Sequence, residues 1–362
     1  MAADRREARQ DRLRASLAAG GLGALLVQSL PNIRYLTGFT GSSALLLVRE
    51  RESVLVTDFR YETQAGREVG QSARLEIDRS SVWQRVARVM TEHPPGRIGF
   101  EAHIATVQDR ARYDELGAET WVPVEGLVEI LRTVKDPEEV AAIRSAAALA
   151  QEALAEVLPG VRVGETEIAV AARLEAALRT RGSEWHPFPT IVASGPRSAL
   201  PHARTSRREI ARGDLLLLDF GAEIDGYCAD LTRVAVVGAK ADQRQRAIHA
   251  LVAEAQARAL GGLRAGLRGR EGDALARELI TQRGHGDAFG HSLGHGLGLE
   301  VHEAPRLAAT DDALLPAGAV VTVEPGIYLP GWGGVRLEDD VLLTETGVEL
   351  LSDNRIDLLE IV

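Results

Sequence analysis

An internal disulfide is excluded because the 362 residues include a single cysteine, Cys228. We expect this thiol to be a small packed residue rather than a metal ligand. No segment approaches the roughly 18 consecutive apolar residues of a membrane-spanning helix. The Arg5-Arg6 pair near the start is not followed by the apolar stretch of a secretion or twin-arginine signal. The sequence therefore predicts no membrane span and a cytoplasmic location.

The chain also has no excess of positive charge. The formal net charge is −10 at pH 7, which argues against nucleic acid or an anionic membrane as the principal partner. Hydrophobic residues make up 45% of the chain and charged residues 26%, a composition typical of globular proteins. The 362 residues are enough for about two domains.

The first part of the chain alternates between strand-like and helical patterns. Strands are predicted at Ala24–Val27, 44–48, Ser53–Asp58, 73–77, 97–100 and 120–122, helices at 4–19, 82–91 and 105–116, and a turn-rich stretch at 32–43. This alternation predicts an α/β domain with helices packed on a mixed sheet. Tyr35 and Phe39 in the turn-rich stretch either reach a partner subunit or pack beneath the loop, and the second interpretation is favoured.

A domain boundary is predicted between residues 133 and 134. Asp136 can cap a helix and Pro137 suits its first position, so a long helix should run from there to about 158. The predicted domains are 1–133 and 134–362. The second reads as α+β, with helices at 165–181, 241–263 and 271–283, strands at 190–194, Leu215–Phe220 and 228–237, and a glycine-rich strand region at 289–348.

Two aspartates flank a predicted β-hairpin in the second domain. Leu215–Phe220 and the strand that follows are joined by Asp225-Gly226, which is typical of tight hairpin turns. With this pair as the turn, Asp219 faces Thr232 and Asp230 lies one diagonal step away. With the turn centred one residue earlier, the two aspartates are directly opposed. Either register puts both carboxylates on one face. Carboxylates about 5 Å apart repel by roughly 3 kcal/mol at an effective dielectric of about 20, so we expect a cation between them.

Other stretches of the second domain also gather metal-competent side chains. These are His202, His291, His295, His302, Glu324 and Glu338. The histidines lie beside glycine or proline, or at the ends of strand-like runs, where the backbone can approach a ligand closely. Glu324 ends the apolar run Val320–Val323. A carboxylate at the end of a buried strand has to be paired, protonated or metal-bound.

The order Asp219, Asp230, His295, Glu324, Glu338 resembles the five-ligand pattern of the pita-bread dinuclear metallopeptidases. Within that group the chain is most similar to the Xaa-Pro peptidases, which are the prolidases and the aminopeptidase P group. The matching stretches are Gly226-Tyr-Cys-Ala-Asp230-Leu-Thr-Arg233, His291-Ser-Leu-Gly-His295-Gly-Leu-Gly, Glu324-Pro-Gly-Ile-Tyr328, Gly333-Gly-Val-Arg336-Leu-Glu338 and, in the first domain, Asn32-Ile-Arg-Tyr-Leu-Thr-Gly-Phe. The resemblance implies a creatinase-like α/β amino-terminal domain followed by a pita-bread catalytic domain.

The resemblance also implies roles for the matching residues. Asp219 would chelate one ion, Asp230 and Glu338 would bridge two, and His295 with Glu324 would complete the second site. Glu324 would act as general base and then as general acid. His302 would hydrogen-bond the scissile carbonyl or the oxyanion, and His202 would help to hold the substrate and support proton transfer. His291 would be a further pocket residue, and Tyr328 and Arg336 would shape proline selectivity.

The implied activity is two-metal hydrolysis of the peptide bond between an N-terminal residue and proline. Two divalent ions would neutralise the four carboxylates, lower the pKa of a water and stabilise the tetrahedral oxyanion. Oxygen-rich ligation with one imidazole favours Mn²⁺, with Co²⁺, Zn²⁺ and Fe²⁺ as alternatives. The expected partners are small proline-containing peptides and a second copy of the chain in a homodimer. The choice between a dipeptidase and a longer-chain aminopeptidase stays open.

Three other readings use the same fold. A methionine-type or broad-specificity aminopeptidase shares the five ligands, but the amino-terminal domain and the stretch 334–336 disfavour it. A creatinase-like amidinohydrolase and a non-catalytic peptide-binding protein do not need all five ligands, which this chain retains. Outside the ligand set, we expect Asp339 and Asp340 to form salt bridges or face solvent and His249 to be structural, while Glu303 has no assigned role.

Overall fold

The computed structural model describes residues 2–92, 96–116, 120–353 and 357–362. The chain divides into two compact units, Met1–Arg132 and Thr133–Val362. Among the described residues, no helix has both the length and the apolar character that a membrane crossing requires.

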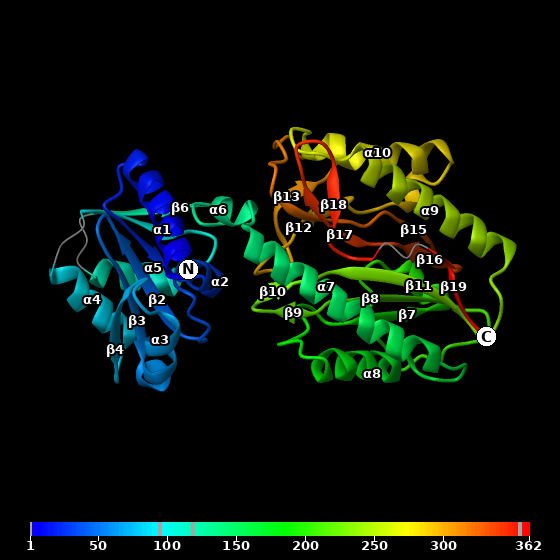
Figure 1. Ribbon diagram of the computed structural model, residues 1–362, viewed down its shortest axis with the longest axis horizontal. Helices are drawn as coiled ribbons and strands as arrows, with labels where there is room; N and C mark the ends of the chain where they lie inside the picture. The colour runs from blue at the N-terminus through cyan, green and yellow to red at the C-terminus, as the bar shows by residue number, and fades with distance from the viewer. Residues whose placement is uncertain (1, 93–95, 117–119, 354–356) are drawn as a thin grey trace. The chain divides into compact units, whose positions relative to one another are not determined.

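The first unit is built on a six-stranded sheet with the order β4-β3-β2-β1-β5-β6 (Figure 1). Its strands are β1 (Ala24–Val27), β2 (Ala44–Arg49), β3 (Ser53–Asp58), β4 (Arg74–Asp78), β5 (Arg97–Glu101) and β6 (Thr120–Val124). Its helices are α1 (Ala2–Ala19), α2 (Leu30–Thr37), α3 (Glu62–Glu68), α4 (Val82–Glu92) and α5 (Val107–Glu115), and α6 (Glu129–Thr133) follows them. Strand β1 pairs antiparallel with β2 and parallel with β5, so the predicted mixed sheet is confirmed.

The predicted turn-rich stretch at 32–43 is partly wrong, because its first half belongs to helix α2. Pro31 occupies one of the first helical positions, which tolerate proline, and Gly38 ends the helix in the left-handed region with φ 78°. Tyr35 and Phe39 are each only 1% exposed. The prediction that both rings pack inside is confirmed.

The second unit contains two larger sheets, β19-β11-β8-β7 and β13-β12-β14-β17-β18, and two small ones, β10-β9 and β15-β16. Its helices are α7 (Pro137–Val157), α8 (Glu167–Thr180), α9 (Gln243–Gly262) and α10 (Gly269–Gln282). Its first strands are β7 (Ile191–Ser194), β8 (Leu215–Phe220), β9 (Glu223–Ile224), β10 (Tyr227–Cys228) and β11 (Leu231–Val237). The others are β12 (Gly294–Gly296), β13 (Glu303–Leu307), β14 (Val320–Val323), β15 (Gly326–Leu329), β16 (Gly333–Arg336), β17 (Asp339–Leu343), β18 (Val348–Leu350) and β19 (Leu359–Ile361).

Helices cover the strands of the second unit from two sides, with α7 and α8 on one and α9 and α10 on the other (Figure 1). Successive side chains of β8 point in opposite directions. Leu216 and Leu218 pack in the cluster with α7 and α8, whereas Leu215 and Leu217 pack in the cluster with α9 and α10. Asp219 therefore shares the face of Leu215 and Leu217, which places its carboxylate in the interior of the unit.

The β8–β11 hairpin adopts the first of the two predicted registers. Asp219 is paired with Thr232, and the two-residue turn is Asp225-Gly226. Both turn residues have positive φ, 51° for Asp225 and 76° for Gly226, as a type I′ hairpin turn requires. Asp230 directly precedes β11 and has the same parity as Thr232, so both aspartates lie on one face.

Asp136 caps helix α7 as predicted. Its side chain accepts hydrogen bonds from the backbone N–H groups of Glu138 and Glu139, and Pro137 is the first helical residue. The cap satisfies donors that would otherwise lack partners at the helix start. The cap therefore fixes the start of α7 at Pro137, close to the start of the second unit at Thr133.

Candidate metal centre

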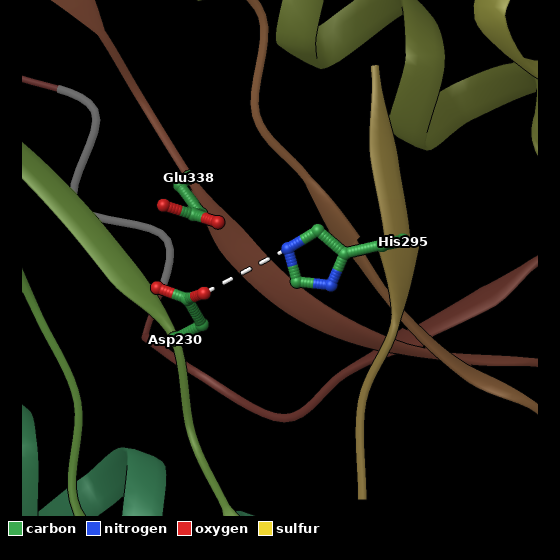
Figure 2. A group of neighbouring side chains, drawn as sticks. All are labelled: Asp230, His295 and Glu338. Carbon is green, nitrogen blue, oxygen red and sulfur yellow. Dashed lines mark ion pairs between the residues drawn. The ribbon is translucent and has the colours of Figure 1, made fainter. Parts of the chain in front are cut away.

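Three side chains converge between strands of the second unit (Figure 2). They are Asp230 from the segment before β11, His295 from β12 and Glu338 from the connection between β16 and β17. One ligand atom of each lies within 4.8 Å of the others. Nε2 of His295 is 3.8 Å from Oδ2 of Asp230. An imidazole and two carboxylates at this spacing can coordinate one ion together.

Glu324 and Asp219 extend the cluster. Oε1 of Glu324, the residue after β14, lies 3.6 Å from Nε2 of His295. Asp219 is connected to Glu338 through Thr232, which is its partner in the β8–β11 register and forms an isolated antiparallel bridge with Glu338. The structure thus brings together the five residues that the sequence pattern grouped.

The four carboxyl groups of the cluster are buried close to one another. Burial and the neighbouring negative charges raise the pKa of Glu338 to about 7 and raise the pKa values of Asp230 and Glu324 well above their usual range. Burial also raises the pKa of Asp219, an effect that the Arg336 charge opposes. Groups held in this way are costly to ionise unless a cation compensates them.

Within the cluster, two buried carboxylate oxygens have no hydrogen-bond partner among the described residues. They are Oδ1 of Asp219 and Oδ1 of Asp230. A buried polar atom without a partner is rare and calls for an explanation such as an ion. Because the same residues provide an oxygen-rich donor set with one imidazole, the site fits divalent metal ions.

His295 is held in the tautomer that a metal ligand needs. Its Nδ1 lies 3.0 Å from the carbonyl oxygen of Gly296. Since a carbonyl only accepts, Nδ1 carries the proton and the lone pair of Nε2 faces the carboxylates. Burial lowers the pKa of His295 to about 4. The ring is therefore neutral at neutral pH.

Arg336, Tyr328 and His291 form a hydrogen-bonded chain beside the carboxylates. Nη1 of Arg336 donates to the Tyr328 hydroxyl at 2.8 Å, and that hydroxyl lies 2.8 Å from Nε2 of His291. Nδ1 of His291 is 2.8 Å from the carbonyl of Ser292 and so acts as the donor there. The Tyr328 hydroxyl therefore donates to His291. Burial, followed by the charge of Arg336, lowers the pKa of His291 to about 4.

His202 and His302 are exposed side chains at the rim of the cluster. The His302 ring lies edge to face against His295, with ring centres 4.3 Å apart. Burial, together with the positive charges of His202 and Arg306, lowers the pKa of His302. The segment before His202 is tied to the site because Nη1 of Arg336 donates to the carbonyl of Pro201 at 3.2 Å.

Sequence reasoning missed the two threonines that hydrogen-bond residues of the cluster. The Thr232 hydroxyl donates to Oε2 of Glu338 at 2.5 Å and accepts from Nε of Arg336 at 3.0 Å. The Thr322 hydroxyl accepts the backbone N–H of His295 at 3.1 Å and donates to Oε1 of Glu324 at 3.4 Å. The predicted pairing of Asp219 with Thr232 was the one available signal for the first threonine.

The expectation for Asp340 was wrong. The residue is fully buried, and its Oδ2 accepts the backbone N–H of Asp230 at 3.1 Å rather than a basic side chain. Strand β17 is paired on both sides, with β14 and β18, and Asp340 is therefore not at an exposed sheet edge. Asp339 does form the expected salt bridge, with Arg233 at 2.7 Å. Cys228 is 4% exposed and packed in a hydrophobic cluster, so the expected packing of this residue is confirmed.

Comparisons with known proteins agree with this fold and site. Residues 141–345 match the model of metallopeptidase family M24, and residues 9–134 match the creatinase/prolidase N-terminal domain. The chain is 34% identical to a Xaa-Pro dipeptidase of Pyrococcus furiosus, over 91% of this chain and 92% of the relative. A solved Xaa-Pro dipeptidase from Bacillus anthracis has a TM-score of 0.95 and 39% identity, covering 98% of this chain and 99% of its own. An X-Pro aminopeptidase from Thermotoga maritima has a TM-score of 0.90 and 37% identity, covering 97% and 99%.

The fold and site thus define a peptidase with a creatinase-like amino-terminal domain and a pita-bread catalytic domain, as predicted. The chain belongs to metallopeptidase family M24. Membership makes it a hydrolase of a family that works with divalent metal ions, which agrees with the cluster of Asp230, His295 and Glu338.

Proposed function

We propose that this protein hydrolyses the peptide bond between an N-terminal residue and proline, using two divalent metal ions with Mn²⁺ as the first choice. The observation that carries the proposal is the convergence of four buried carboxyl groups and one neutral imidazole, with two carboxylate oxygens lacking partners among the described residues. Relatives named as Xaa-Pro dipeptidases and an X-Pro aminopeptidase support the substrate class.

The proposed ligands follow the sequence pattern. Asp219 would hold one ion, Asp230 and Glu338 would be shared by both, and His295 with Glu324 would complete the second site. A shared position suits Asp230 because the charges of Glu338, Asp219 and Glu324 all act on its carboxyl group and raise its pKa. When bound, two such ions supply Lewis-acid polarisation of a carbonyl and a water of lowered pKa.

Glu324 is the proposed proton carrier. Its Oε1 lies 3.6 Å from Nε2 of His295, and its Oε2 lies 3.8 Å from Nδ1 of His291. Burial and nearby carboxylates raise its pKa well above the usual range, so it can take a proton from the attacking water. It then returns the proton to the leaving prolyl nitrogen.

His302 and His202 are proposed to act on the substrate from the exposed rim. His302 donates a hydrogen bond to the scissile carbonyl oxygen as negative charge develops there. His202 holds the substrate and supports proton transfer. Arg336, Tyr328 and His291 are proposed to line the pocket and shape the preference for proline, which their shared hydrogen-bonded chain supports by keeping the three side chains in fixed positions.

We also propose a domain boundary, a substrate class and an oligomeric state. We place the domain boundary between residues 133 and 134, close to the division of the chain into compact units between Arg132 and Thr133. The substrates are small proline-containing peptides, and the active form is a cytoplasmic homodimer. The similarity to both dipeptidases and an aminopeptidase keeps both peptide lengths in the proposal.

The test is a hydrolysis assay on the chelated protein with Mn²⁺ added back. Xaa-Pro, Xaa-Pro-Yaa and Met-Ala peptides are compared at matched concentration. Cleavage before proline with Mn²⁺, and none after chelation, is the expected result. Cleavage of Met-Ala peptides without cleavage of either proline series would replace the proposal with a methionine-type aminopeptidase.

A further inference from the structure

His302 lies at the end of the loop of residues 297–302, which connects β12 to β13. Leu297 and Val301 pack in a hydrophobic cluster, and the N–H of Leu297 donates to the carbonyl of Val320 at 3.1 Å. Gly298 donates to the carbonyl of Glu300 at 3.1 Å, and its own carbonyl accepts the N–H of Cys228 at 2.8 Å. These contacts hold the first part of the loop, whereas the exposed His302 ring lies at its far end, beside Glu303.

A buried ion pair fastens the end of this loop. Nζ of Lys135 lies 3.1 Å from Oε2 of Glu303, the residue after His302. The two side chains are only 1% and 7% exposed. Oε1 of the same carboxylate accepts the backbone N–H of Glu300 at 3.1 Å. The Glu303 carboxylate thus contacts both the loop backbone at Glu300 and Lys135, which lies in the segment before α7.

Lys135 is itself fixed by the body of the second unit. Its backbone N–H donates to the carbonyl of Gly318 at 2.8 Å, and Val134 forms a bridge with Ala319. Its Nζ also donates to the carbonyl of Thr133 at 3.4 Å. The ammonium group is therefore held in a fixed position next to the end of the loop that carries His302.

Gly298 shows how closely the Glu303 carboxylate fits the loop. A Cβ at this position would lie 2.7 Å from both carboxylate oxygens of Glu303. Only glycine leaves the space for the carboxylate to lie over the loop backbone. The position of the Glu303 carboxylate and the conformation of the loop thus depend on each other sterically.

We infer that Lys135 is a positioning residue for His302, acting through Glu303 and the loop 297–302. This inference rests on the proposed function, in which His302 contacts the scissile carbonyl. Loss of the Lys135 charge makes burial of the Glu303 carboxylate more costly, and the end of the loop then shifts toward solvent. His302 moves away from the reacting carbonyl while the metal ligands keep their places.

The test is a double-mutant cycle of Lys135→Met with His302→Ala, with Arg246→Met as the control that breaks an exposed pair with Glu360. In the wild-type background, Lys135→Met should lower kcat roughly ten- to a hundredfold with little change in KM and unchanged metal content. In the His302→Ala background the same substitution should cost less than about twofold. Lys135→Arg should restore part of kcat, and Arg246→Met should change nothing. Equal losses in the two backgrounds would overturn the inference.

A second variant separates positioning from folding. Lys135→Met/Glu303→Gln removes both charges, so no buried charge is left alone and thermal stability should recover. Its kcat should stay low because the loop is no longer anchored. Recovery of both stability and kcat would show that the pair has no positioning role.

Hydrogen exchange tests the same link without substrate. Amides of residues 298–303 should exchange faster in Lys135→Met, whereas amides of β8 and β11 should keep their wild-type rates. Unchanged exchange in the loop would contradict the inference. If the wild-type protein cleaves no Xaa-Pro peptide, the proposed function fails, and this measurement still decides whether Lys135 holds the loop.

Discussion

Nη2 of Arg336 donates to Oδ2 of Asp219 at 2.5 Å, and the two side chains are only 4% and 12% exposed. The contact leaves Oδ1 of Asp219 as the oxygen available to an ion. It also adds a positive charge to a cluster of four carboxyl groups. With two divalent ions bound, the ionised groups sum to one net positive charge, which favours the negative charge that develops on the substrate.

Arg336→Lys should lower kcat/KM roughly ten- to a hundredfold, because one ammonium cannot reproduce the planar set of contacts that Arg336 makes. Those contacts reach Asp219, the Thr232 and Tyr328 hydroxyls and the Pro201 carbonyl. Steady-state kinetics on a Xaa-Pro peptide measure the loss. Wild-type kinetics in this variant would mean that the geometry of the guanidinium is not needed.

Thr232→Val should weaken metal binding by about ten- to a hundredfold, since ligand-orienting contacts typically carry this much affinity. Valine has nearly the same shape but cannot donate to Oε2 of Glu338. Titration of the chelated protein with Mn²⁺ measures the change. Thr180→Val is the matched control, because the Thr180 hydroxyl is exposed and bonds within its own helix. Equal affinities in the two variants would contradict the role of Thr232.

The five candidate residues could be grouped from the sequence because each lies beside a local signal. Asp225-Gly226 left two hairpin registers open, but both put Asp219 and Asp230 on one face, and the structure adopts the register that pairs Asp219 with Thr232. Helix α2 was missed because Pro31 and Gly38 look like turn residues, although they stand at its two ends. Asp340 and the Lys135–Glu303 pair could not be predicted, because their partners come from contacts distant in sequence. Periodicity carries no information about such contacts.

His249→Leu should gain stability relative to the wild-type chain as the pH falls below 6.5. His249 is 5% exposed on α9, and burial lowers its pKa to about 4 from the usual 6.5. A histidine with a depressed folded pKa contributes stability that is present above pH 6.5 and is lost as the pH falls toward 4. The free energy of unfolding of the wild-type chain, taken relative to that of the variant, should therefore be about 2 kcal/mol lower at pH 5 than at pH 7.

Denaturant unfolding of the chelated protein at pH 5 and pH 7 checks this prediction, because chelation removes any pH-dependent metal binding from the comparison. The buried carboxyl groups titrate equally in both proteins and cancel in the difference. A stability difference that does not change between the two pH values would show that His249 titrates normally.

Chelation should destabilise the protein, and two equivalents of Mn²⁺ per chain should restore it. Four buried carboxyl groups repel one another without a cation, and an ion that binds only the folded state stabilises it by about 2.7 kcal/mol at one hundred times its Kd. Thermal unfolding during Mn²⁺ titration, together with elemental analysis, measures both effects.

Asp230→Asn should bind less metal and lose hydrolysis, because Asp230 is a proposed ligand of both ions with an oxygen that lacks a partner among the described residues. Asp312→Asn, at an exposed position, should behave as wild type. A chelated protein that keeps its stability and activity would exclude the metal centre.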